Sequence, residues 1–146
     1  MKSKIFFTLL VVCAVLGFRM AAADAEYQPQ ERTTKDGIYT EEQANRGADL
    51  IRQIGCANCH GSTLEGGPCE TPSLIGNSFL QEWVGQTAND MAIKVSSMPP
   101  DHRDVRKAQD NVDILSLLLA INGYPAGNTE LSSDPEVLKR IKVVFP

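Results

Sequence analysis

The stretch Cys56-Ala57-Asn58-Cys59-His60 places two thiols and an imidazole within five residues. The spacing C-x-x-C-H is the signature at which haem is attached covalently through two thioether bonds. At the start of a helix, both thiols can face one porphyrin while His60 lies directly beneath its iron. The stretch therefore predicts one covalently bound haem, attached at Cys56 and Cys59 and ligated by His60.

Two other readings of these residues are open. A structural zinc site needs four ligands, but the only other histidine is His102 and the sequence has no second C-x-x-C pair. A thioredoxin-type redox pair is expected next to a strand-helix-strand pattern, whereas both flanks of this stretch look helical or loop-like. Haem attachment is therefore the reading that we favour.

The first 25 residues have the pattern of a secretory signal: basic residues near the start, an apolar run over 5–18, and small residues before Asp24. We expect this segment to be removed and the protein to be exported to the periplasm. No later apolar run is long enough to span a membrane. Loss of three basic residues and one acidic residue changes the net charge from −4 to −6, which makes nucleic acid an unfavourable partner.

The remaining chain has room for one small domain, which we expect over residues 40–125. Residues 26–39 are polar without periodicity and predict an extended arm. Thr40 and Gln43 form a capping box for a helix over 41–54, in which Gly47 allows a second helix to approach closely. Gly55 ends this helix just before the cysteines.

The loop after His60 is rich in glycine and proline. A ligating histidine almost always donates its second ring N–H to a fixed acceptor, and the carbonyl of Pro72 is the best candidate, although Pro72 can also be only a turn residue. Trp83 follows in an apolar cluster at helical spacing. Its indole N–H can reach a haem propionate, but a simple core aromatic explains it equally well.

Met98 is the candidate for the second axial ligand. It stands between the end of a helix that begins near Thr87 and two prolines, and its thioether sulfur is a suitable ligand for haem iron. Met91 and His102 are the rivals, but Met91 falls within an apolar helical stripe, where methionine usually fills the core.

A final long helix is expected over 108–122, apolar on more than one face and ended by Gly123. The segment 126–146 is expected to be an extension with one short helix, because Asp134 and Pro135 repeat the chemistry of a helix start.

With these elements in order, residues 40–125 resemble class I cytochrome c. The resemblance implies an all-α cytochrome c fold, with three to five helices around one haem and the first and last helices crossing. It also implies thioether attachment at Cys56 and Cys59, ligation by His60 and Met98, and a hydrogen bond from His60 to Pro72. The chain departs from the family at the crossing, where Ile51 and Leu117 replace the usual aromatic residues.

The expected function is that of a soluble, exported electron carrier with one His/Met-ligated haem c and no catalytic activity of its own. The segment 122–131 also resembles the tail of cytochromes that accept electrons from quinoprotein dehydrogenases. Such a donor and an oxidase or another cytochrome as acceptor are the expected partners. The alternatives are a cytochrome subunit of a larger oxidoreductase, and a haem enzyme or gas sensor.

A basic cluster of Lys94, Arg103, Arg106 and Lys107 is the candidate docking surface. Cys69 is expected to be a free thiol.

Overall fold

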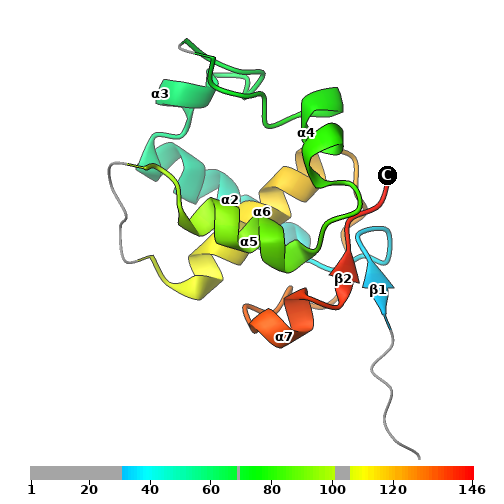
Figure 1. Cartoon of the computed structure of the whole chain (residues 1–146). Coiled ribbons are helices and arrows are strands. Elements are labelled where there is room, and N and C mark those ends of the chain that lie inside the picture. Colours follow the sequence, from blue (N-terminus) through cyan, green and yellow to red (C-terminus); the bar gives the residue numbers. More distant parts are fainter. Residues whose placement is uncertain (1–30, 69, 101–105) are drawn as a thin grey trace, which may run out of the picture.

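The computed structural model describes residues 31–68, 70–100 and 106–146 (Figure 1). These residues are mostly helical, as expected, with one small parallel sheet that we did not predict. The described elements are β1 (Arg32–Thr33), α2 (Glu41–Ile54), α3 (Ala57–His60), α4 (Gly76–Trp83), α5 (Ala88–Ser96), α6 (Ala108–Ile121), α7 (Pro135–Leu138) and β2 (Ile141–Lys142).

Helix α2 begins and ends where its sequence predicts. The Thr40 side chain accepts a hydrogen bond from the backbone N–H of Gln43, and the Gln43 side chain accepts one from the backbone N–H of Thr40. Gly55 then adopts a left-handed conformation with φ of 79°, which a residue with a Cβ atom rarely adopts. This glycine turns the chain out of α2 and directly into the cysteine stretch.

Helices α2 and α6 cross at the centre of the molecule (Figure 1). Gly47 is the point of closest approach, because a Cβ atom there would lie 2.1 Å from the carbonyl oxygen of Asp113. Ile51 is buried and Leu117 packs against the same core. The predicted close approach at Gly47 is therefore confirmed, and both aliphatic residues named for the crossing lie in or against the core.

Helix α5 covers a further face of α6. Its start is a second capping box, in which the Thr87 side chain accepts from the backbone N–H of Asp90 and the Asp90 carboxylate accepts from the backbone N–H of Thr87. Met91 on this helix is 1 % exposed, as are the core residues Phe79 and Val112. Burial of α6 on several sides, which its sequence predicted, follows from its position between α2 and α5.

The expectation of an extended arm is wrong for the described residues 31–39. Ile38 and Tyr39 are buried, and the Tyr39 hydroxyl donates a hydrogen bond of 2.7 Å to the carbonyl of Tyr124. Strand β1 pairs in parallel with β2, near the other end of the chain. The error has a clear cause, because the partners of this segment lie about a hundred residues away and leave no local pattern.

The segment 126–146 contains the short helix that we expected. Asp134 caps α7 through the backbone N–H of Glu136, Pro135 occupies its first turn, and Leu138 is buried. The segment continues into β2, which lies with α7 on the side of the α2–α6 pair opposite to α3 (Figure 1). Ile141 and Val143 are buried there, so this extension forms part of the same core.

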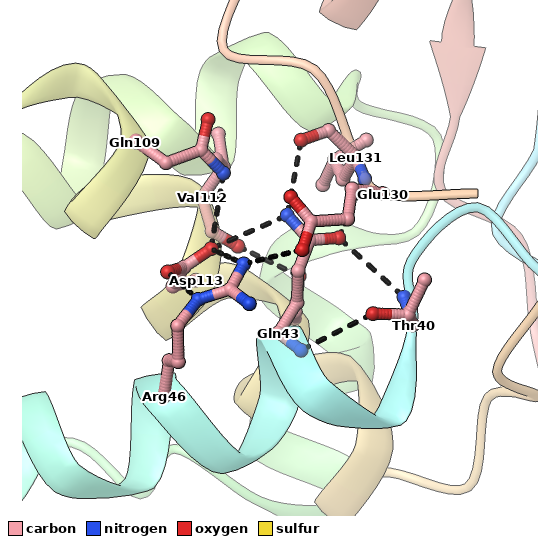
Figure 2. A network of polar contacts seen from close by, with 9 residues as sticks. Thr40, Gln43, Arg46, Gln109, Val112, Asp113, Glu130 and Leu131 are labelled. Atoms are coloured by element: carbon pink, nitrogen blue, oxygen red, sulfur yellow. Dashed lines mark hydrogen bonds and ion pairs between the residues drawn. The ribbon is translucent and has the colours of Figure 1, made fainter. Parts of the chain in front are cut away.

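A polar network joins α2, α6 and the segment before α7 (Figure 2). The buried carboxylate of Asp113 accepts hydrogen bonds from Arg46 at 2.7 and 3.2 Å, from Gln43 at 3.2 Å and from Gln109 at 3.0 Å. Arg46 also binds Glu130. Burial by itself would raise the pKa of Asp113, but these donors lower it below its ordinary value. The network thus fixes the rotation of α2 against α6.

Candidate haem-binding site

The two cysteines lie on a single helical turn. Cys56 precedes α3, and its carbonyl accepts from the backbone N–H of Cys59 at 3.2 Å and of His60 at 3.0 Å. Both thiols are free. Cys56 is half-buried and packs against the core, whereas Cys59 is exposed. One short turn therefore presents both sulfur atoms together with the imidazole that follows.

Arg106 lies close enough to Cys56 to act on its thiol. Burial raises the pKa of Cys56 above its ordinary value, and the positive charge of Arg106 opposes this effect only in part. The protonated thiol is therefore the favoured form of Cys56.

His60 is oriented by the loop that follows it, as the sequence predicts. Its Nδ1 atom lies 2.8 Å from the carbonyl oxygen of Pro72. A carbonyl oxygen can only accept a hydrogen bond, so Nδ1 carries the proton of the pair. In the neutral imidazole, Nε2 then has the free lone pair that a metal ligand needs.

The loop from Gly61 to Pro72 packs tightly on the cysteine turn. The backbone N–H of Gly66 donates to the His60 carbonyl at 3.0 Å, and that of Leu74 donates to the Leu64 carbonyl at 2.8 Å. A Cβ atom at Gly67 would lie 1.8 Å from the carbonyl oxygen of Cys59. The absence of a side chain at Gly67 is thus what lets the loop bring the Pro72 carbonyl to His60.

Met98 lies two residues after the end of α5 and is half-buried. Its backbone N–H donates to the Val95 carbonyl at 3.1 Å, and its own carbonyl accepts from the Arg106 guanidinium. The rival Met91 is enclosed in the core, where the sequence pattern placed it. His102, the other rival, lies outside the described residues.

Trp83 is half-buried at the end of α4 and packs against the core. Within the part of the chain that the structure describes, its indole N–H donates no hydrogen bond to protein. Its predicted contact with a haem propionate stays a prediction. The cysteines Cys13 and Cys69 and the predicted signal segment also lie outside the described residues.

The chemistry of these residues fits a c-type haem. Two thiols on one turn would hold the haem covalently, and the Nε2 atom of His60 and the sulfur of Met98 are the protein groups that would ligate its iron. Half-buried apolar side chains that a porphyrin could contact surround the core, namely Leu50, Ile54, Leu64, Leu74, Leu80 and Val95.

The two other readings of the cysteine stretch gain no support. Over residues 31–68, 70–100 and 106–146, the structure shows no group of three His, Cys, Asp or Glu residues that could hold a metal ion. The C-x-x-C pair also begins at the N-cap of α3, just after α2 rather than after a strand, which differs from the setting expected of a thioredoxin-type pair.

The described residues of the basic cluster differ in their exposure to solvent. Lys94 and Lys107 are exposed, but the half-buried guanidinium of Arg106 is occupied by carbonyl oxygens of the protein. Arg103 lies outside the described residues. Of the described members, only the two lysines present their charge to solvent.

No family model, curated protein or solved structure matches this chain.

Proposed function

We propose that the protein is a monohaem electron carrier in which Cys56 and Cys59 hold the haem and His60 and Met98 ligate its iron. The observation that carries this proposal is the hydrogen bond between His60 Nδ1 and the Pro72 carbonyl. An imidazole held in this way beside two thiols on one turn has its lone pair directed away from the protein acceptor and available to a metal. A redox-active disulfide does not need an oriented histidine beside its cysteines, and neither does a helical turn with no bound cofactor.

When bound, the haem supplies one-electron chemistry through its ferric and ferrous states. His60, fixed by Pro72, holds one axial position without the freedom to dissociate readily. The Met98 thioether stabilises ferrous iron and raises the reduction potential. Since both axial positions are then filled by protein, no position is open for a substrate or a gas, which favours a carrier over a haem enzyme or gas sensor.

The proposed setting is the periplasm, after export by the segment 1–25. The proposed partners are other redox proteins, with a quinoprotein dehydrogenase as donor and an oxidase or another cytochrome as acceptor. Within the described residues, no helix has the length and apolar character to cross a bilayer. The exposed Lys94 and Lys107 support docking to an acidic surface by electrostatic steering.

The first test asks whether the haem is covalent. The protein is expressed with a c-type haem assembly system and extracted with acidified acetone. We expect the haem to stay with the protein, and the intact mass to rise by one haem. Cys59→Ser should leave at most one thioether and lower the yield of haem-bearing protein, because the second sulfur is lost. Complete extraction of haem from the unmodified chain would refute the proposal.

The second test identifies the sixth ligand. A thioether bound to ferric haem gives a weak charge-transfer band near the red end of the visible spectrum. We expect Met98→Ala to abolish this band and Met91→Leu, the matched control in the core, to retain it, because only Met98 is free to reach the iron. Loss of the band in the Met91 variant alone would reassign the ligand.

A further inference from the structure

Arg106 is held in an unusual position between two helices. Its Nη2 atom donates to the Val95 carbonyl at 2.7 Å and to the Met98 carbonyl, and its Nε atom donates to the Asn111 side chain at 3.2 Å. Asn111 is buried in the first part of α6. A guanidinium is planar and always charged, so these three contacts fix its orientation.

Arg106 binds the Val95 carbonyl in the last turn of α5, at the negative end of the helix dipole, and the Met98 carbonyl two residues beyond that helix. A cation at this end stabilises the last turn. Since one of these two carbonyls is that of Met98 itself, the same contacts determine where the backbone of Met98 lies. The chain of contacts therefore runs from Asn111 on α6 through Arg106 to Met98.

We infer that Arg106 is a positioning residue that holds the Met98 backbone in place and thereby keeps the Met98 sulfur on the haem iron. The inference rests on the proposed function, because it concerns a ligand of that site. In this role, the guanidinium of Arg106 binds groups of its own chain, whereas its charge alone suggested that it would contact a partner protein.

The test measures how readily an external ligand displaces Met98. Imidazole is titrated into the purified ferric holo-protein, and the loss of the charge-transfer band is followed. Its apparent affinity depends on the fraction of molecules in which Met98 has left the iron. In Arg106→Gln, we expect the apparent affinity for imidazole to increase at least tenfold and the reduction potential to fall.

Three further variants distinguish positioning from charge. Arg106→Lys keeps the charge but not the planar fork, so its imidazole affinity should lie between those of the unmodified protein and Arg106→Gln. Asn111→Ala removes only the contact that orients the guanidinium and should raise the affinity by a smaller factor. Lys107→Gln removes a neighbouring exposed charge without any contact to Met98, and it should leave the affinity unchanged.

The outcomes separate the inference from the proposed function. If the unmodified protein shows the band, and Arg106→Gln and Asn111→Ala bind imidazole as the unmodified protein does, the positioning role is overturned while the electron-carrier proposal stands. If Lys107→Gln changes the affinity as much as Arg106→Gln, general charge rather than position is responsible, and the inference again fails. If the unmodified protein has no band, both the ligand assignment and the inference fall.

Discussion

Substitution of Gly47 by alanine tests the crossing on which the fold depends. The added Cβ atom would lie 2.1 Å from the Asp113 carbonyl oxygen, 2.7 Å from the Asp113 carbonyl carbon and 3.0 Å from the Cβ atom of Leu117. Two of these neighbours are backbone atoms of a helix, which cannot rotate away as a side chain can. Helices α2 and α6 must therefore separate by about 1 Å to restore an ordinary van der Waals contact.

The expected cost follows from this separation. Overpacking of a tight core contact costs about 3 kcal/mol, and the change from glycine to alanine within a helix returns about 1 kcal/mol. The net loss of about 2 kcal/mol corresponds to a decrease in Tm of about 8 °C for a domain of this size. The haem spectrum should stay the same, because the crossing lies away from the cysteine turn.

Thermal unfolding of the holo-protein, followed by far-UV circular dichroism, measures this change. The matched control is Asn45→Ala, which adds a better helix former at an exposed position of α2 and should leave Tm equal or slightly higher. A Tm for Gly47→Ala at or above that of the unmodified protein would show that the helices are not in close contact at this point.

Two further predictions concern the polar network and the cysteine loop. The lowered pKa of Asp113 means that its contribution to stability is complete above about pH 4, the value in the unfolded chain, and is lost as the pH falls through the lower folded value. Asp113→Asn should therefore cost about 2 kcal/mol at pH 6 and clearly less at pH 2.5 in guanidinium unfolding; an equal difference at both values would contradict the role of the charge. Gly67→Ala should lower the haem-to-protein absorbance ratio severalfold, since its Cβ atom would displace the loop that carries Pro72, whereas the exposed control Ser62→Ala should not. An unchanged ratio in the Gly67 variant would show that haem attachment does not require this packing.

Local signals in the sequence predicted the helices well. The capping boxes at Thr40 and Thr87 and the stop at Gly55 each depend on residues within four positions of one another, so they can be recognised without the fold. The predicted hydrogen bond between His60 and Pro72 was also found, because a connection of only twelve residues keeps the Pro72 carbonyl within reach of the imidazole.

Long-range polar contacts could not be predicted in the same way. In the sequence, Asp113 and Ser116 are two polar positions within a largely apolar helix, and nothing local indicates a partner for either. The structure buries both of them: Ser116 donates to the Val112 carbonyl at 2.7 Å, and Asp113 is paired with residues of α2. Nothing near Arg106 indicated that its guanidinium turns inward to the end of α5. Such pairings depend on which helices meet, and only the fold determines that.

The parallel pair of β1 and β2 has a consequence for the order of events during synthesis. Thr34 accepts a hydrogen bond from the backbone N–H of Val144 across 110 residues of chain. Closing a loop of this length costs about 4 kcal/mol of chain entropy, so the pair forms late. In a chain that emerges from its amino end, the cysteine stretch is outside long before residue 141 arrives. The interval before the two ends join leaves the thiols on an open chain, accessible to the haem attachment that we propose.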